Sequence, residues 1–338
     1  MDLNLFLTIF GFAFLIFALV LPGWLLRKGG LVKSEAVGGF ANALLYVASP
    51  MLVFKALLYD SESGFNPKDR NVLSVILWTA AVTLFVHTIG VLIAKLAFFR
   101  SKKPDSASVY TYASVFGNVG FLGIPFVEYL MPGDMTALIS CTFVNAVFNV
   151  LMWTLGVFIL TGDIKQVKPA RIFLNPVVLT LAVALPLLFC EVDLRSVFSP
   201  LADIIKFLGN MAAPLSMMIV GMRLADMPLK SLFTDWQAYL ASGLKLLIFP
   251  LAALGVLLVC KAAGAFGAPD GAFFSGFGKT MCMVIVATAA MPVGANTIAF
   301  CVKFDKDYQA GIKSVMNSTL LSLITLPLFL PLLFMLLS

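Results

Sequence analysis

Ten apolar runs, each long enough to cross a lipid bilayer, dominate this chain of 338 residues. A membrane-spanning helix needs about 20 consecutive apolar residues. Only 12% of the residues are charged, against about 25% in soluble globular proteins. The sequence therefore predicts an all-α, polytopic membrane protein with ten transmembrane helices. The runs cover residues 3–26, 36–58, 72–99, 107–131, 135–161, 172–190, 197–223, 236–260, 272–302 and 310–337.

Lysine and arginine are distributed unequally between alternate connections. One set of connections carries thirteen of these residues and the other set carries four. Because positive residues accumulate on the cytoplasmic side, we expect both termini on the extracytoplasmic side of the plasma (inner) membrane. The basic residues are not interleaved with aromatic residues in a patch, so nothing in the sequence indicates nucleic-acid binding.

A basic connection at residues 162–171 divides the chain into two halves of five runs each, residues 1–161 and 172–338. An odd number of spans per half gives the two halves opposite orientations, as in many secondary transporters. Pro50 in the second run and Pro214 in the seventh lie at corresponding places in the two halves. We therefore expect two inverted five-helix repeats joined by a cytoplasmic basic linker.

The fourth and ninth runs contain residues that interrupt helices. The fourth contains the stretch GNVGFLGIP, and the ninth contains MPVGANTIAF. Proline lacks an N–H donor and clashes with the preceding turn, while glycine permits unusual dihedral angles, so both spans are expected to unwind near the midplane. Unpaired backbone groups are costly in lipid, so the unwound segments must face protein or a cavity. Alternatively, the glycines permit close helix packing and the proline is a tolerated kink.

Paired interruptions in inverted halves indicate a substrate site where the two unwound spans cross. Half-helix N-termini offer N–H groups and partial positive charge to a carboxylate. On the fifth run, Asn145 and Asn149 lie one turn apart and either line the same cavity or bond neighbouring helices. The candidate substrate-binding residues are Gly117, Asn118, Gly120, Pro125, Asn145, Asn149, Pro292, Gly294, Asn296 and Thr297.

The two interrupted stretches together resemble the paired signature of the auxin efflux carrier family, in its bacterial branch. The resemblance covers essentially the whole chain. It implies a fold of the bile/arsenite/riboflavin transporter type, with spans one, two, six and seven as a scaffold and the other six as a moving transport unit. It also implies that Asn118, Pro125, Pro292 and Asn296 belong to the crossing. Bacterial members are associated with malate, malonate and similar organic anions, and the long central loop of the plant members is absent here.

The titratable residues favour an anionic substrate. All seventeen acidic residues lie in connections or near the ends of runs, whereas proton relays and cation antiporters place carboxylates deep in the bundle. His87, the only histidine, lies midway along the third run, and Lys245 lies inside the eighth. Histidine titrates near physiological pH, so His87 and Lys245 are candidates for ion coupling. Alternatively, His87 is a packing residue with satisfied hydrogen bonds.

Enzyme functions find no support in the sequence. One histidine, no cluster of metal ligands and no paired aspartates leave out the usual catalytic arrangements, and the five cysteines have no metal-like spacing. We expect no cofactor and no metal. The favoured function is a secondary carrier that moves a small organic anion, such as malate or malonate, by alternating access of an elevator-like kind. A membrane-embedded ligand-binding receptor is the alternative. The exact substrate, the coupling ion, the direction of transport and the presence of a homodimer stay open.

Overall fold

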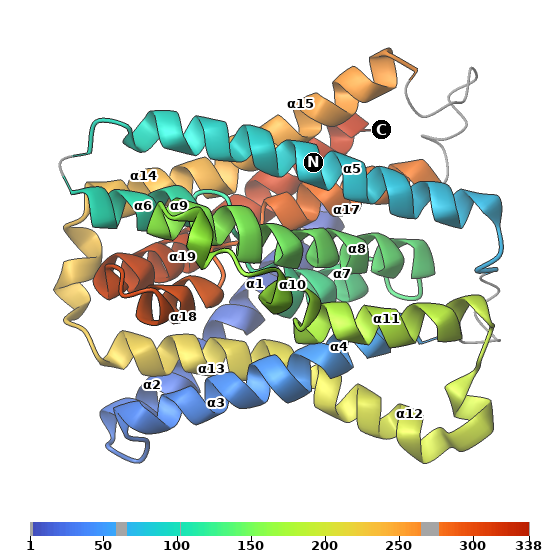
Figure 1. The fold of residues 1–338 in the computed structure, drawn as a ribbon, viewed down its shortest axis with the longest axis horizontal. Helices are drawn as coiled ribbons and strands as arrows, with labels where there is room; N and C mark the ends of the chain where they lie inside the picture. Colours follow the sequence, from blue (N-terminus) through green and yellow to red (C-terminus); the bar gives the residue numbers. More distant parts are fainter. Residues whose placement is uncertain (1–2, 59–65, 102, 265–276, 338) are drawn as a thin grey trace.

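The protein is a bundle of helices, most of which run along one direction (Figure 1). The computed structural model describes residues 3–58, 66–101, 103–264 and 277–337. Within these residues the regular structure is helical, apart from one isolated β-bridge. Seven of the helices there are long and apolar enough to cross a membrane: Leu3–Lys28, Ser34–Ala56, Val72–Phe98, Met135–Thr161, Leu194–Ala225, Trp236–Ala262 and Tyr308–Leu337.

Several of these long helices are composed of successive helical elements, and further elements lie between them. In the first half, the helical elements are α1 (Leu3–Ala18), α2 (Val20–Lys28), η1 (Ser34–Ala36), α3 (Val37–Ala43), η2 (Leu44–Ala48), α4 (Ser49–Ala56), α5 (Arg70–Phe98), α6 (Pro104–Ala113), η4 (Val119–Gly123), α7 (Ile124–Leu130), α8 (Met135–Leu151), η5 (Met152–Gly156) and α9 (Val157–Thr161). In the second half, they are η6 (Ile164–Gln166), α10 (Pro169–Phe173), α11 (Pro176–Phe189), α12 (Leu194–Asn210), α13 (Ala212–Ala225), η7 (Leu229–Phe233), α14 (Trp236–Gly243), η8 (Leu244–Ile248), α15 (Phe249–Ala262), α17 (Phe277–Ala289), α18 (Asn296–Lys303) and α19 (Tyr308–Leu337).

Three of the ten predicted runs do not form a continuous spanning helix. Runs 107–131 and 272–302 are interrupted, as their glycines and prolines predict. Run 172–190 is also interrupted, contrary to the prediction of one uninterrupted span, because α10 ends at Phe173 and α11 has only 14 residues. At 1.5 Å per residue, α11 is about 21 Å long, shorter than the roughly 30 Å hydrocarbon layer.

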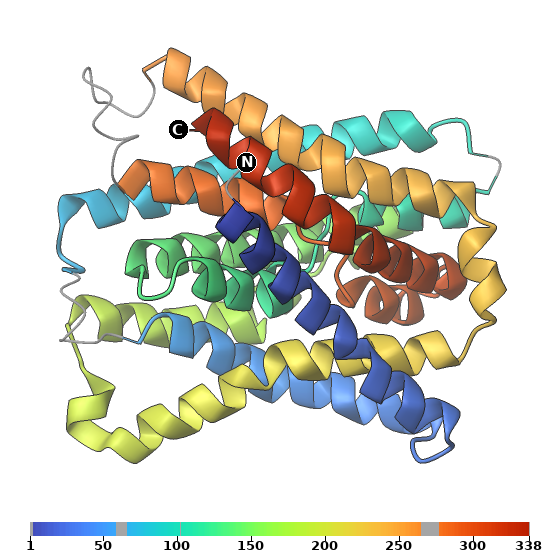
Figure 2. The same cartoon turned by 180° about the vertical axis from the view of Figure 1, so that it is seen from behind.

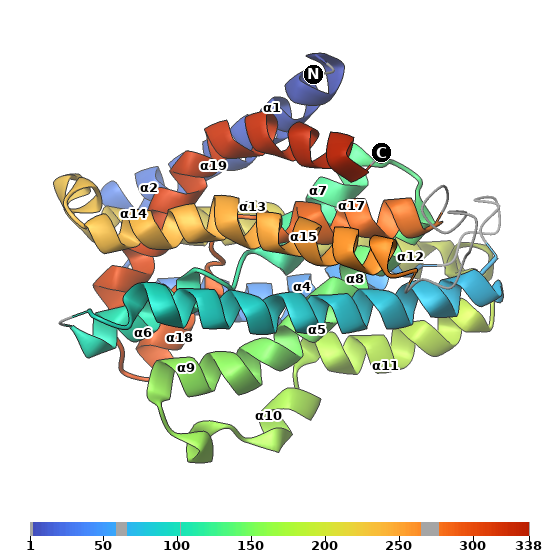
Figure 3. The same ribbon diagram turned by 90° about the horizontal axis from the view of Figure 1, so that it is seen from above.

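The helices pack around two apolar cores. The larger core lies mainly among α5, α6, α8, α14, α15, α17 and α19, and the second lies mainly among α4, α8, α11 and α13, so that α8 and α13 contribute to both. In Figure 1 the helices α3, α4, α12 and α13 lie together along the lower edge. Seen from above, α1 and α19 lie on one side of the bundle, and α9, α10 and α11 lie on the other (Figure 3). Most residues around the interruptions of runs 107–131 and 272–302 are buried between these sides.

Two glycines allow α2 and α13 to pack with their backbones nearly in contact. A Cβ atom at Gly23 would lie 2.0 Å from the Met218 carbonyl oxygen, and one at Gly221 would lie 2.0 Å from the Val20 carbonyl oxygen. Such an approach tolerates no side chain. The first and seventh predicted runs are thus packed closely together.

The connections that carry most of the basic residues lie at one end of the bundle. The α2–α3, α5–α6, α13–α14 and α18–α19 connections are on the left in Figure 1 and on the right in Figure 2, and the α7–α8 and α11–α12 connections are at the opposite end. The charge asymmetry read from the sequence is therefore an asymmetry between the two ends of the folded molecule.

Candidate functional site

The two interrupted runs cross inside the bundle. Helix α6 ends at Ala113, and helical structure resumes at Val119 in η4, which continues into α7. Helix α17 ends at Ala289, and α18 begins at Asn296. Two helix C-termini and two helix N-termini therefore meet at the crossing, and these ends carry partial negative and partial positive charge respectively.

Backbone hydrogen bonds join the two unwound segments. Gly117 and Val293 form an antiparallel β-bridge, and the Asn118 N–H donates to the Pro292 carbonyl oxygen at 2.7 Å. The Val293 N–H donates to the Ser318 hydroxyl of α19 at 2.9 Å. Backbone groups that lose helical partners are thus paired within the protein, as a low-dielectric surrounding requires. The unwound segments form a defined structure.

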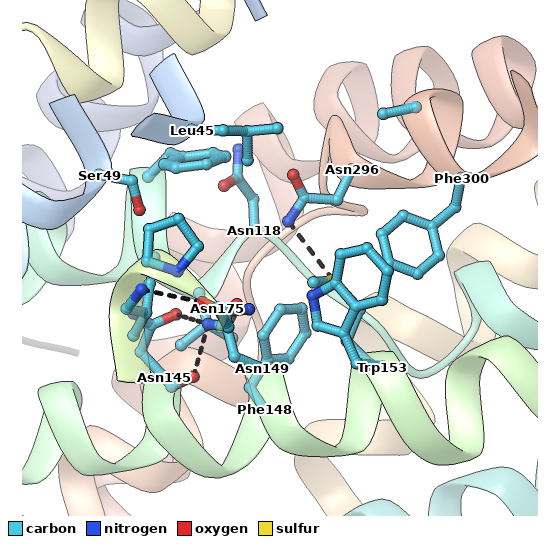
Figure 4. A pocket seen from close by; sticks show the side chains of 18 of the residues that line it. Leu45, Ser49, Asn118, Asn145, Phe148, Asn149, Trp153, Asn175, Asn296 and Phe300 are labelled. Atoms are coloured by element: carbon cyan, nitrogen blue, oxygen red, sulfur yellow. Dashed lines mark hydrogen bonds between the residues drawn. The ribbon is translucent and has the colours of Figure 1, made fainter. Parts of the chain in front are cut away.

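A cavity of about 80 Å³ lies beside the crossing, counted as the space open to the centre of a water molecule. Such a space accommodates several waters or one small solute, because one water needs roughly 10–15 Å³ by this measure. Figure 4 shows side chains from both halves of the chain around it. Among the residues that the structure describes, no aspartate, glutamate, lysine or arginine lines it. Its polar lining includes the side chains of Tyr46, Ser49, Asn118, Asn145, Asn149, Trp153, Asn175 and Asn296.

Three of these asparagines form a hydrogen-bonded chain from α8 to α11. The Asn149 amide nitrogen donates to the Asn145 side-chain oxygen at 3.1 Å, and the Asn175 amide nitrogen donates to the Asn149 oxygen at 3.2 Å. The Asn175 oxygen accepts from the Val177 N–H at 2.8 Å and so caps α11. Asn149 thus bonds the start of a neighbouring helix, whereas Asn145 bonds Asn149 within α8, and both residues line the cavity.

The two asparagines of the crossing keep donor and acceptor capacity available. The Asn296 amide nitrogen lies 3.6 Å from the Met152 sulfur, which is a weak acceptor. Asn118 is 4% exposed, and its side chain makes no capping hydrogen bond to η4. In Figure 4 both amides lie above the α8 asparagines, on the opposite side of the cavity. A bound solute could therefore be contacted from two sides.

The other residues predicted for the site have different surroundings. Gly117 and Gly120 line the cavity, whereas Pro125, Pro292, Gly294 and Thr297 do not. Pro292 and Gly294 lie in the unwound backbone, Pro125 lies at the start of α7, and Thr297 is buried in α18. These four residues lie in or next to the crossing without lining the cavity.

His87 and Lys245 line a second, smaller cavity of about 10 Å³. The His87 Nδ1 atom lies 2.8 Å from the Thr83 carbonyl oxygen, one turn earlier in α5. A carbonyl only accepts, so Nδ1 is the donor. The ring also contacts Phe116, Phe148 and Phe249. His87 is thus buried, with one ring nitrogen paired, and shares the small cavity with Lys245.

Asn175 is the main site residue that the sequence reading missed. Asn175 lies inside run 172–190, for which hydropathy predicts one continuous helix, and it separates α10 from α11. The available signal was the dipeptide Asn175–Pro176, since asparagine at the N-cap and proline at the first helical position together mark a helix start. Trp153 also lines the cavity, although the sequence did not predict it as a site residue. The Lys303 ammonium lies 4.5 Å from the centroid of the Trp153 ring.

Comparison with known proteins gives relatives over nearly the full chain. A family described as "Membrane transport protein" matches residues 8–170 and 161–330. An uncharacterized transporter from Methanothermobacter thermautotrophicus is 27% identical over 319 residues, which cover 93% of this chain and 95% of the relative. A protein of Rhizobium meliloti named "Putative malonate transporter" is 25% identical over 321 residues, 91% of each chain. An uncharacterized transporter from Methanocaldococcus jannaschii is 24% identical, over 93% of this chain and 96% of its own length.

Proposed function

The chain belongs to the membrane transport protein family, and we propose that it is a secondary carrier for a small organic anion. Its two interrupted runs carry the paired signature of the auxin efflux carrier family. The proposed substrates are dicarboxylates such as malonate or malate. One observation carries this proposal: in the described part of the chain, the cavity at the crossing is lined by five asparagine amides and by no acidic side chain. The name of the Rhizobium meliloti relative points to the same class of substrate.

The chemistry of the cavity suits carboxylates. Val119 begins η4 and Asn296 begins α18, and both line the cavity, so two helix N-termini contribute partial positive charge. The Asn118 and Asn296 amides add neutral donors that can orient a carboxylate. Each helix end contributes about 0.3–1 kcal/mol when exposed and up to about 2 when partly buried. Binding of this strength is weak and reversible, as a carrier requires.

The proposed mechanism is alternating access of an elevator-like kind. The first, second, sixth and seventh runs form the scaffold, supported by the close α2–α13 contact, and the other six move with the crossing. We also propose ten membrane spans in two inverted repeats, residues 1–161 and 172–338. The basic end of the bundle faces the cytoplasm and both termini lie outside. In this arrangement the interrupted runs 107–131, 172–190 and 272–302 each form one membrane span.

His87 is the proposed proton-responsive group. A His87→Gln variant keeps a side-chain donor for the Thr83 carbonyl but cannot titrate near neutral pH. If His87 couples transport to protons, the variant loses the pH dependence of uptake. An unchanged pH profile assigns His87 to packing alone.

A membrane receptor that binds the same anions without moving them is the second candidate, since a buried site alone serves both functions. Purified protein in proteoliposomes distinguishes them. A carrier accumulates labelled malonate or malate inside vesicles and exchanges it for unlabelled internal anion. A receptor shows saturable binding to the protein with no internal accumulation, a result that would contradict the proposed function.

A further inference from the structure

Lys245 is a lysine whose side chain lies in the interior of the bundle. It lies in η8, in the middle of the helix Trp236–Ala262, and is 1% exposed. No aspartate or glutamate is buried in the described part of the chain, and no ion pair to Lys245 is found there. An unpaired charge in the interior is costly. Its position therefore calls for a functional explanation.

The Lys245 ammonium binds the C-terminal end of α17. Its Nζ atom donates to the Ala289 carbonyl oxygen at 2.7 Å, and Ala289 is the last residue of that helix. The Nζ atom also lies 4.3 Å from the centroid of the Phe249 ring. Carbonyls at a helix C-terminus lack helical partners and carry partial negative charge, and the face of an aromatic ring also attracts cations. Both contacts stabilise the charged form.

Gly117 places the ammonium directly against the crossing. A Cβ atom at Gly117 would lie 2.9 Å from the Lys245 Nζ atom, so only glycine leaves room for the lysine. Gly117 also lines the cavity with the five asparagines, and Lys245 lines only the smaller one. The unwound backbone at Gly117 therefore separates the ammonium from the substrate cavity by one layer of chain.

Carriers with discontinuous helices use unwound carbonyls and half-helix C-terminal ends to coordinate a coupling cation. We propose that Lys245 is a tethered cation that occupies this position and supplies, through the Gly117 backbone, the positive charge that balances an anion in the cavity. Transport then requires no sodium ion at the crossing. The substrate part of this inference rests on the proposed function, whereas the tethered-cation part concerns the protein alone.

The first test measures the tethered cation without any substrate. Lys245→Ala removes the atoms of one n-propylammonium ion, so that ion is the probe, and n-propanol is an uncharged control of similar shape. We expect the thermal unfolding midpoint of the purified variant to fall, and n-propylammonium chloride to restore at least about half of the loss. Propanol and sodium chloride should restore much less. Equal restoration by propanol, or none by the ammonium, would overturn the proposal.

The second test measures anion uptake. Lys245→Met keeps the length of the side chain without its charge, and uptake should fall at least about tenfold, which corresponds to about 1.4 kcal/mol. Lys95→Met is the matched control, because Lys95 is an exposed lysine that also lies over a phenylalanine ring, Phe158, at 5.6 Å. Uptake by Lys95→Met should stay near the wild-type rate.

The unmodified protein gives a test that does not depend on a variant folding. Uptake should be the same when sodium is replaced by potassium or choline at constant ionic strength. Uptake that requires sodium, or wild-type uptake by Lys245→Met, would overturn the inference. If the unmodified protein carried none of the anions, the proposed function would fail instead, and the propylammonium result would still decide whether Lys245 is a tethered cation.

Discussion

Substitution of Gly117 by alanine should damage the crossing more than any comparable glycine substitution. The new Cβ atom would lie 2.9 Å from the Met291 carbonyl oxygen and 2.6 Å from the Lys245 Cε atom, closer than normal contacts permit. The Met291 carbonyl belongs to the backbone and cannot rotate away. Relief requires the two segments to separate, which strains the 2.7 Å bond from the Asn118 N–H to the Pro292 oxygen.

The expected cost of Gly117→Ala follows from these two effects. Overpacking in a closely packed interior costs about 1–3 kcal/mol, and loss of one hydrogen bond costs about 0.5–1.5 kcal/mol. We therefore expect the free energy of unfolding to fall by about 1.5–4.5 kcal/mol. Gly255→Ala is the matched control, because it lies inside α15 with no atom within 4 Å of the new Cβ. That change should stabilise the helix by about 0.5–1 kcal/mol.

Denaturant titration of both variants in the same detergent measures the difference, provided that the slopes agree with that of the unmodified protein. Transport by Gly117→Ala should also fall sharply, since the crossing positions both Asn118 and Lys245. If Gly117→Ala were as stable and as active as Gly255→Ala, the described crossing would not exist in the working protein.

Three further predictions concern the site, a polar contact at the basic end and the orientation. Asn118→Ala and Asn296→Ala should each lower uptake at least about tenfold at nearly unchanged membrane abundance; normal uptake by both would remove the amides from the site. Burial raises the pKa of the Asp235 carboxyl, but hydrogen bonds from Tyr110 and Lys313 outweigh this effect and hold the pKa below its ordinary value of 3.8. The stability that these bonds contribute is present at pH values above the pKa of Asp235 in the unfolded chain, and it is lost as pH falls through the pKa in the folded protein. Asp235→Asn should therefore lower the unfolding midpoint equally at about pH 7 and about pH 5.5. If the difference between variant and unmodified protein disappeared at the lower pH, this prediction would be contradicted. A C-terminal reporter active only in the cytoplasm should stay inactive in cells, and an active one would refute the orientation.

The helical class and the interrupted runs could be predicted because they depend on local sequence. Hydrophobic length fixes which segments can span a membrane, and glycine with proline fixes where a helix unwinds. Hydropathy predicts run 172–190 as one uninterrupted span, because it is insensitive to the break that one asparagine and one proline create at the edge of this apolar run. The dipeptide Asn175–Pro176 marks this helix start, and the hydrogen bond from the Val177 N–H shows the N-cap role of Asn175.

The partners of the site residues were beyond the reach of the sequence. Gly117 and Lys245 are far apart in the chain, and their contact depends on how α14, η8 and α15 pack against the crossing. The same applies to the chain of amides from Asn145 to Asn175, which joins two helices. Sequence spacing predicted that Asn145 and Asn149 share a helix face, but which neighbour they bond is a property of tertiary packing.

Competition between acids and their amides tests the central claim most directly. Labelled malonate uptake into proteoliposomes should be inhibited by unlabelled malonate and malate. Malonamide has nearly the same shape but no negative charge, and it should not compete, because the helix N-termini and Lys245 attract only an anion. If malonamide inhibited uptake as strongly as malonate, the crossing would not be an anion site and the account would be contradicted.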